Sequence, residues 1–409
     1  MTFMNNHPTH LLRQTSSTKL KDKTIVLAVT GSIAAVRTVE LVRELIRHGA
    51  KVRAVMSDAS AGIIHPDALH YATGEPVITR ITGAVEHVEY CGEQGTADLL
   101  LIAPCTANTI SKMALGIDDT PPTTFAATAL GSDIPILVVP AMHGTMYKHP
   151  AVVENIEKLK GMGVHFIGPI IEENIAKITT NEEILLCIQR KLGDNSLKDK
   201  RVIITGGATM ESIDPIRVLT NRASGRTGVA LAQEAFRRGA EVVLVHPGIL
   251  GLFGITEVAA ESAHEMISRV LDEIDRGCDL LVSSAAISDY TMEASGSKIK
   301  SGQELSLNLR PTAKLLQKVR ETYPDLDIIG YKAETHVSES ELLTSGRELL
   351  RKYNLSMVVA NDVGSQGMGT EINSVYLLDF SGASVGPVAG TKQFIASVII
   401  DRYVGAASK

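Results

Sequence analysis

Continuous apolar runs alternate along the chain with segments of helical periodicity. Two of the runs begin alike, because Lys-Asp-Lys precedes TIVLAVTG at 24–31 and precedes RVIITGG at 201–207. Each run ends in glycine, leads into a helical pattern and is followed, after Gly-Ala, by a second apolar run. Such runs are typical of strands buried on both faces of a parallel sheet, and the order of elements is that of a βαβ unit. The chain therefore begins this unit twice.

The same periodicities predict further elements in both halves. Strands are expected at 99–104, 135–140, 164–169, 279–286, 328–334 and 357–362. Helices are expected at 37–48, 106–115, 150–161, 181–192, 225–239, 262–276 and 311–321. The polar residues 193–196 separate the two halves. We expect an α/β chain with two doubly wound, Rossmann-like parallel-sheet domains at 21–193 and 197–405, preceded by a polar tail at 1–20.

Composition narrows the class of protein. The hydrophobic fraction of 44% and the charged fraction of 21% are ordinary for a globular chain and exclude wholesale disorder. A formal charge of -6 without long like-charge blocks argues against a nucleic-acid partner. No apolar run approaches the roughly 20 residues of a bilayer span, so no membrane partner is expected. The four cysteines form no CxxC pair, which disfavours a zinc site or disulfides and indicates a reducing cytoplasm.

Ligands of open parallel sheets bind beyond the carboxyl ends of the strands, so candidate chemistry is sought there. Gly31 and Ser32 follow the first strand, and Ser57 follows the second. The dinucleotide fingerprint GxGxxG is absent, and a hydroxyl stands where a dinucleotide enzyme would hold the ribose with an acid. The two serines suit a phosphate monoester, as on a mononucleotide. The alternative is that both serines cap helices.

Three further polar positions in the first half are candidates. Asn108 in PCTANT and His143 and Met146 in PAMHGTMY follow later strands. Asn108 either caps a helix or points into the cleft, and the methionine could be ordinary core packing. His87 in AVEHVEY is an acid–base candidate because imidazole titrates near neutrality, although a lone histidine is more often structural.

The motifs GSIAA, PCTANT and PAMHGTMY, in this order, resemble those of the flavin-dependent decarboxylases of peptidyl-cysteine and phosphopantothenoylcysteine. The resemblance implies bound FMN, with Gly31, Ser32 and Ser57 near its phosphate and Asn108 in the cleft. It also implies that His87 is the active-site histidine. In such a site the flavin accepts electrons from the carbon that bears the thiol, carbon dioxide leaves, and the electrons return.

Two departures from the decarboxylase pattern affect this interpretation. His143 stands where the family usually has an asparagine that grips the departing carboxylate; imidazole can also donate a hydrogen bond, so His143 and Met146 are assigned to substrate binding. The cysteine that reprotonates the intermediate in most members is missing from 167–178. Loose candidates for its role are Glu172, Glu173 and Lys177. Cys187 lies too far along the chain to take this role, in a helical pattern. A segment at 167–178 without cysteine resembles that of the archaeal-type branch of the family.

The second half carries a different set of polar clusters. A loop at 219–228 contains Asn221 and Arg226 and opens a helix, which favours polyphosphate binding, although Ser224 could simply cap that helix. A Walker A motif is absent. Asp289, Lys298 in KIK, Tyr331 in YKAET and Lys352 on the next expected helix follow. Taken singly, KIK suits an exposed strand edge and Lys352 a solvated helical face.

Together, DPIR, TN-x-x-SG-x-x-G, AAISDY, KIK, GYKAET and VAND resemble phosphopantothenate–cysteine ligase. With the flavin half, nearly all of the chain after residue 22 resembles the archaeal-type bifunctional decarboxylase/ligase family of coenzyme A synthesis. The resemblance implies that CTP activates 4'-phosphopantothenate as an acyl-cytidylate, that cysteine displaces CMP, and that magnesium bridges the triphosphate. It assigns Asn221 and Lys298 to catalysis and Arg226 to substrate. The expected CTP contacts are Asp289, Lys298, Tyr331 and Lys352, and no side chain is expected to ligate a metal.

The resemblance also bears on assembly. The family's flavin sites form between subunits, in trimers and trimer-based dodecamers, so a homo-oligomer is expected. Two alternatives stay open from the sequence. One is a nicotinamide-dependent oxidoreductase of the same architecture, and the other is a ligase whose flavin half is inactive.

Overall fold

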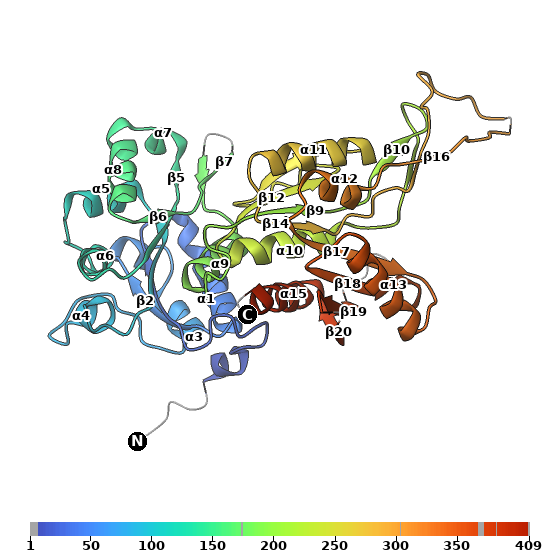
Figure 1. Ribbon diagram of the computed structural model, residues 1–409. Helices are drawn as coiled ribbons and strands as arrows, with labels where there is room; N and C mark the ends of the chain where they lie inside the picture. Colours follow the sequence, from blue (N-terminus) through green and yellow to red (C-terminus); the bar gives the residue numbers. More distant parts are fainter. Residues whose placement is uncertain (1–6, 173–174, 303, 367–371, 382, 408–409) are drawn as a thin grey trace. The chain divides into compact units, whose positions relative to one another are not determined.

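The computed structural model describes residues 7–172, 175–302, 304–366, 372–381 and 383–407. The chain divides into two compact units, residues 1–193 and 194–409 (Figure 1). The polar stretch from Gly193 to Ser196 lies at this division.

The amino-terminal unit contains a five-stranded parallel sheet in the order β2-β1-β3-β4-β6. Its strands are β1 (Thr24–Val29), β2 (Lys51–Met56), β3 (Leu99–Cys105), β4 (Ile136–Pro140) and β6 (His165–Phe166). A small antiparallel sheet joins β5 (Met142–His143), β8 (Ile175–Lys177) and β7 (Ile170–Glu172). Strand order reverses between β1 and β3, and the loops that follow these two strands diverge at this point. A doubly wound sheet binds ligands at such a point.

Helices surround this sheet. They are η1 (Pro8–Leu12), η2 (Ile33–Arg37), α1 (Thr38–Arg47), α2 (Asp58–Ala61), α3 (Pro66–Thr73), α4 (Glu86–Cys91), α5 (Ala107–Leu115), α6 (Pro121–Gly131), α7 (Gly144–Tyr147), α8 (Pro150–Gly161) and α9 (Asn181–Leu192). The helix expected at 37–48 is preceded by the 3₁₀ turn η2, and the strand expected at 164–169 is reduced to two residues.

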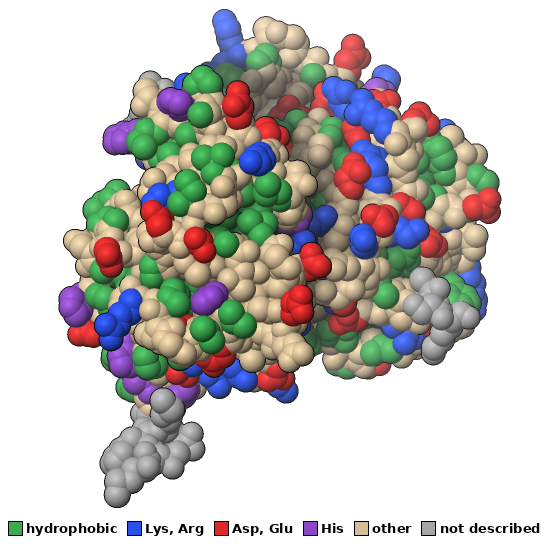
Figure 2. All heavy atoms as spheres, turned by 90° about the vertical axis from the view of Figure 1, so that its left-hand side faces the viewer, with side chains coloured by type: hydrophobic (Ala, Val, Ile, Leu, Met, Phe, Trp, Pro, Cys, Tyr) green, Lys and Arg blue, Asp and Glu red, His purple; other side chains and the backbone are tan. Residues whose placement is uncertain are grey.

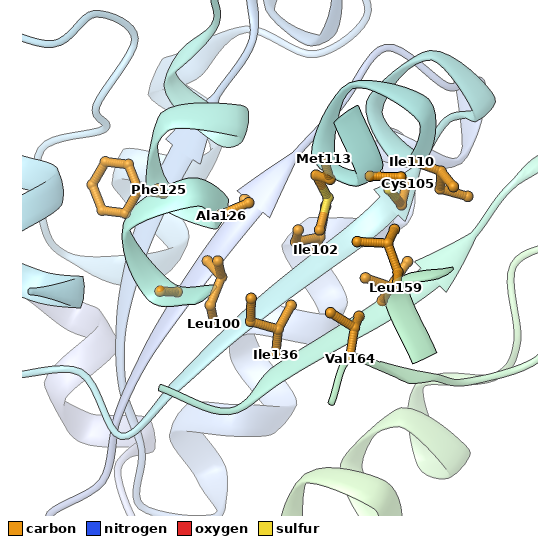
Figure 3. Packing of buried hydrophobic residues seen from close by; sticks show 14 of the residues in the cluster. Leu100, Ile102, Cys105, Ile110, Met113, Phe125, Ala126, Ile136, Leu159 and Val164 are labelled. Carbon is orange, nitrogen blue, oxygen red and sulfur yellow. The ribbon is translucent and has the colours of Figure 1, made fainter. Parts of the chain in front are cut away.

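Aliphatic side chains hold helices against the sheet. Leu100 and Ile102 of β3 pack with Ile136 of β4, and α5 adds Ile110 and Met113 (Figure 3). Every residue of β3 is buried, as its unbroken apolar sequence predicts. Burying one Leu or Ile side chain contributes about 1.5–3 kcal/mol. These contacts fix the carboxyl end of β3, which leads into the turn that carries Asn108.

Residues 7–20, which were expected to belong to a polar tail, pack against the amino-terminal unit. The Thr9 hydroxyl donates to the Tyr71 carbonyl over 2.8 Å. Leu20 is fully buried, and its N–H donates to the His48 carbonyl over 2.8 Å. A few anchored residues are enough to order this polar segment, and its average composition conceals them. The expectation of a tail is therefore wrong for residues 7–20, and residues 1–6 lie outside the described part.

The carboxyl-terminal unit contains an eight-stranded sheet in the order β13-β12-β9-β14-β17-β18-β19-β20. Its strands are β9 (Arg201–Thr205), β12 (Glu241–His246), β13 (Thr256–Ala259), β14 (Leu280–Ser283), β17 (Asp327–Glu334), β18 (Met357–Asp362), β19 (Ile372–Asp379) and β20 (Ser384–Thr391). All pairings through β18 are parallel, whereas β19 and β20 are antiparallel. The expected parallel sheet thus ends in an antiparallel edge.

The helices of this unit cover the sheet, and two short strand pairs project from it. The helices are α10 (Arg226–Arg237), α11 (Ala263–Asp275), α12 (Leu315–Thr322), α13 (Glu339–Lys352), α14 (Val363–Gln366) and α15 (Lys392–Ala407). The strand pairs are β10 (Met210–Ser212) with β11 (Val218–Thr220), and β15 (Tyr290–Thr291) with β16 (Arg310–Pro311). They form an arm that reaches away from the sheet (Figure 1). The helix expected at 311–321 begins at Leu315 because the preceding residues belong to the arm.

Surface chemistry agrees with the even charge distribution of the sequence. Figure 2 shows acidic and basic side chains interspersed with apolar and neutral ones over the face in view. Across the described residues, every helix is too short or too polar to cross a bilayer.

Candidate active sites at the carboxyl ends of two sheets

A cavity of about 840 Å³ opens at the carboxyl ends of β1, β2 and β3 in the amino-terminal unit. The predicted residues Gly31, Ser57, Asn108 and Met146 all line it. It lies where the strand order reverses, which is the expected ligand position in this fold. Its volume is within the range of pockets that enclose a whole cofactor.

The turn after β1 leaves no room for a side chain. A Cβ on Gly31 would lie 2.6 Å from the Cβ of Ala59 in α2, so a larger residue would displace that helix. The Ser57 hydroxyl accepts a hydrogen bond from the Ser60 N–H over 3.2 Å, so Ser57 caps α2 and also borders the cavity. Ser32 precedes η2 but makes no capping bond through its side chain. Ser57 thus combines a helix cap with a place at the cavity, whereas capping does not explain Ser32.

Asn108 is exposed at the start of α5 and faces the cavity. Thr106 performs the capping, because its hydroxyl accepts from the Thr109 N–H over 3.3 Å. One helical turn after Asn108, Lys112 also lines the cavity and donates to both carboxylate oxygens of Asp119, over 2.7 and 2.8 Å. This ion pair was not among the features predicted from the sequence. The four-residue spacing from Asn108 on a helix was the signal that would have found Lys112.

The two predicted histidines are placed differently from the other candidates. His143 is exposed at the start of α7, and neither His143 nor His87 is among the described residues that line the cavity. His87 lies on α4 with its Nδ1 atom buried and without a hydrogen-bond partner among the described residues. The structure of one chain therefore brings Gly31, Ser57, Asn108 and Met146 together and leaves the histidines apart from them.

The segment that lacks the family cysteine forms β7 and β8. Among the loose candidates for a proton donor, Lys177 ends β8, Glu172 ends β7, and Glu173 lies outside the described residues. Cys187 lies within α9, where burial raises the pKa of its thiol to about 12. Its thiol stays neutral and unreactive near neutral pH.

Two adjoining cavities lie at the carboxyl ends of the strands in the second unit. One has about 160 Å³ and the other about 330 Å³. Gly207, Ala223, Ser224 and Gly225 border both. The smaller cavity is also lined by Tyr331, Asn361, Asn373 and Lys392, and the larger one by Met210, Asn221, His246 and Leu250. The turn after β9 and the start of α10 therefore form a wall between two chambers.

That wall depends on glycine. A Cβ on Gly228 would lie 2.7 Å from the Cα of Gly206, so α10 and the turn after β9 touch backbone to backbone. The residue before α10 is Gly225, with φ of 75° and no side chain to cap the helix. The alternative in which Ser224 caps this helix is wrong. The first N–H groups of α10 stay available to an anion at the cavity.

Asn221 and Tyr331 border different chambers. The Asn221 Nδ2 donates to the Ala286 carbonyl over 3.0 Å, which fastens the loop to the segment after β14. The Tyr331 hydroxyl is buried and has no hydrogen-bond partner among the described residues, and burial raises the pKa of this phenol. Arg226, the first residue of α10, is exposed beside the smaller chamber. His246 was missed by the sequence analysis; its Nε2 lies 2.9 Å from the Glu257 carboxylate.

Lys298 and Asp289 lie on the arm. Asp289 is ion-paired with Lys314, and Lys298 is exposed in the segment that joins β15 to β16. Neither residue lines the two chambers described above. Lys352 ends α13 with its Nζ 5.0 Å from the ring centroid of Tyr353, and it is also absent from both linings.

The arm is held together by the DPIR motif. The Asp214 side chain is fully buried and accepts from the Ile299 N–H over 3.1 Å, while the Arg217 guanidinium donates to the Ile299 carbonyl over 2.6 Å. The Arg217 guanidinium holds the pKa of Asp214 well below its usual range. These bonds fix the residue that follows Lys298. Throughout the described residues, no group of three or more His, Cys, Asp or Glu side chains could hold a metal ion.

Comparisons with known proteins match each half of the chain to a family. The family described as Flavoprotein matches residues 13–193, and the family described as DNA/pantothenate metabolism flavoprotein C-terminal domain matches residues 197–406. The coenzyme A biosynthesis bifunctional protein CoaBC of Thermococcus kodakarensis is 49% identical over 376 residues, which cover 91% of this chain and 93% of that protein. The chain belongs to the CoaBC family.

Further CoaBC relatives extend the match. The protein of that name from Methanocaldococcus jannaschii is 39% identical over 399 residues, 97% of each chain. A crystal structure of the C-terminal domain of a CoaBC protein is 29% identical, with a TM-score of 0.44, and covers 53% of this chain and 99% of that one. This CoaBC chain is a bifunctional enzyme of coenzyme A biosynthesis, with a flavoprotein decarboxylase half and a ligase half. The nicotinamide-dependent alternative is not favoured.

Proposed function

We propose that the two units catalyse consecutive steps, in which the product of the carboxyl-terminal unit is the substrate of the amino-terminal unit. The carboxyl-terminal unit joins cysteine to 4'-phosphopantothenate with CTP through an acyl-cytidylate, and the amino-terminal unit decarboxylates the product with FMN. The observation that supports this most directly is the pairing of a cofactor-sized cavity on one sheet with two adjoining chambers on the other. We place the enzyme in the cytoplasm, where its cysteines stay reduced.

The amino-terminal cavity fits FMN. Gly31 and Ser57 border it after two neighbouring strands, and the backbone at Gly31 lies so close to α2 that a Cβ there would be 2.6 Å from the Cβ of Ala59. Asn108 and the Lys112–Asp119 pair supply donors and acceptors along the same wall. When bound, FMN would supply a reversible acceptor for two electrons. We assign Gly31, Ser32 and Ser57 to its phosphate and Asn108 to the cleft.

The remaining decarboxylase roles belong to side chains that handle protons and carboxylate. His87 takes the proton of the cysteinyl thiol, because an imidazole can accept it near neutral pH. We assign His143 and Met146 to the substrate, with the His143 ring donating to the carboxylate that leaves. His87 and His143 lie outside the lining of their own cavity. We therefore propose a trimer-based homo-oligomer, up to a dodecamer, in which a second chain completes the flavin site.

In the ligase unit, the carboxylate of 4'-phosphopantothenate attacks the α-phosphate of CTP and pyrophosphate leaves. The cysteine amine then attacks the acyl carbon and CMP leaves. The first turn of α10 and Tyr331 line the smaller chamber, which suits the nucleotide, and Asn221 lines the larger one, which suits the acyl group. We assign Arg226 to substrate and Asp289 and Lys298 to the nucleotide when the arm closes over it. Magnesium reaches the site with the triphosphate.

The test is to incubate the full chain with CTP, phosphopantothenate and cysteine and to follow products by mass spectrometry. We expect phosphopantothenoylcysteine and then phosphopantetheine. Accumulation of phosphopantothenoylcysteine without phosphopantetheine would indicate an inactive flavin half. The absence of both products would refute the ligase assignment.

Two variants assign the steps to the two units. H87N is expected to keep flavin absorbance and ligation but to lose carbon dioxide release, because no imidazole takes the thiol proton. N221D is expected to spare decarboxylation of added phosphopantothenoylcysteine and to impair amide formation. Each variant is the control for the other. Unchanged decarboxylation by H87N, or full ligation by N221D, would remove that residue from the mechanism.

A further inference from the structure

The chamber that contains Tyr331 is also bordered by Lys392, which is remote in sequence from every motif assigned to the nucleotide. Lys392 is the first residue of α15, and α15 packs against α10. It lines the 160 Å³ chamber and the small cavity beside it, together with Thr227, Tyr331 and Asn373. The packing of the two helices therefore brings the Lys392 side chain to the same space as the first turn of α10.

The electrostatics of this space suit an anion. Lys392 is partly buried, and burial followed by the neighbouring Arg226 guanidinium lowers the pKa of its ammonium group. Among the described residues that line the chamber there is no acidic side chain. Two cationic groups and the positive end of a helix dipole make the local potential positive.

An independent observation also indicates a ligand. Tyr331 lines the same chamber, and its hydroxyl is buried and without a hydrogen-bond partner among the described residues. Leaving such a group unpaired costs free energy, and such groups are rare in folded proteins unless a ligand satisfies them. A phosphate oxygen would accept from this hydroxyl and from an ammonium group at once.

We propose that Lys392 binds the polyphosphate of the nucleotide, in place of the CTP contact that was expected of Lys352. This inference rests on the proposed ligase function. The helix α13 starts after the carboxyl end of β17 and runs back to the amino end of β18, so Lys352 at its last residue lies at the opposite edge of the sheet from the chamber. Lys392 lies at the correct edge because β20 is antiparallel and returns the chain there.

Binding measurements on the full chain test the proposal. CTP and CMP are titrated by calorimetry into the unchanged chain, K392Q, K392R and the matched control K352Q, with magnesium present and the other substrates absent. We expect K392Q to weaken CTP binding about 10- to 100-fold, as for the loss of one charge-assisted hydrogen bond, and to change CMP binding much less. K392R should recover part of the affinity, and K352Q should match the unchanged chain.

A second measurement does not depend on the folding of a variant. The unchanged chain is acetylated briefly with and without CTP, and the modified lysines are quantified by mass spectrometry. We expect CTP to protect Lys392 and to leave Lys352 as reactive as before. Equal losses of CTP and CMP binding in K392Q, or no protection of Lys392 in a chain that binds CTP and ligates, would overturn this proposal alone. A chain that binds no CTP would overturn the ligase assignment as well.

Discussion

Replacing Tyr331 with phenylalanine is expected to stabilise the unliganded protein while weakening nucleotide binding. The ring of Tyr331 belongs to β17, and its hydroxyl oxygen is buried without a partner among the described residues. A buried hydroxyl that has lost its water and gained no hydrogen bond costs about 1–3 kcal/mol. Phenylalanine fills the same space without this cost. The free energy of unfolding should therefore rise in Y331F.

Differential scanning calorimetry measures this gain in stability as a shift in Tm. For domains of about 150–250 residues, each kcal/mol shifts Tm by about 2–4 °C, so the transition of the carboxyl-terminal unit should rise by at least about 2 °C. The transition of the flavoprotein unit should not move, which provides an internal control. Nucleotide affinity should fall in the same variant, because the hydroxyl can no longer donate to the ligand.

Tyr403 offers a matched control with the opposite sign. Its hydroxyl donates to the Asp327 carboxylate over 2.8 Å, so Y403F removes a satisfied hydrogen bond and should lower Tm. Both changes remove one phenolic oxygen from the same unit. If Y331F lowers Tm as Y403F does, the Tyr331 hydroxyl is already paired in the folded protein and the reasoning is refuted.

Two further predictions concern the same unit. G228A should lower the free energy of unfolding by about 1–3 kcal/mol and impair ligation, because its Cβ would lie 2.7 Å from the Cα of Gly206; unchanged melting and turnover would contradict this. For Glu257, burial would raise the pKa, but the N–H groups of Leu250 and Leu252 and the His246 ring together lower it. Its stabilising effect is thus present above the unfolded pKa of 4.5 and is lost as the pH falls through the lower folded value. Denaturation of E257Q and the unchanged chain should differ more at pH 7 than at pH 4, and a difference that grows in acid would contradict the assignment.

The parallel strands were predictable because burial on both faces leaves an unbroken apolar sequence. The strand expected at 99–104 is observed as Leu99–Cys105, and the one expected at 357–362 as Met357–Asp362. The antiparallel pair β19 and β20 was not predicted. Six of the eight residues of β20 are exposed, so no apolar run marks this strand, and it pairs in the sheet only with β19.

The site was predictable where a motif directly follows a strand. Gly31, Ser57 and Asn108 reach one cavity for this reason, and Asn221 reaches a second one after β11, whereas Tyr331 reaches the adjoining chamber from within β17. Residues that reach the site through contacts between distant elements were not predictable. Lys392 enters its chamber because α15 packs against α10, and a local pattern carries no information about that contact.

Lys352 and His87 show the converse limit. The motif before Lys352 is at the correct edge of the sheet, but a whole helix separates it from the lysine and carries that residue to the other edge. His87 precedes β3 in the sequence, as the family pattern requires. It nevertheless does not line the cavity of its own chain. Spacing along a sequence does not show to which edge of the sheet a following helix carries a residue.

The hydrogen bonds between the DPIR turn and Ile299 have a mechanical consequence for the arm. The Ser295 N–H also donates to the Ile213 carbonyl over 2.9 Å, so both projecting strand pairs are latched together near Lys298. Neither can swing out while the other stays. Any movement of one strand pair relative to the sheet therefore carries the other pair and Lys298 with it.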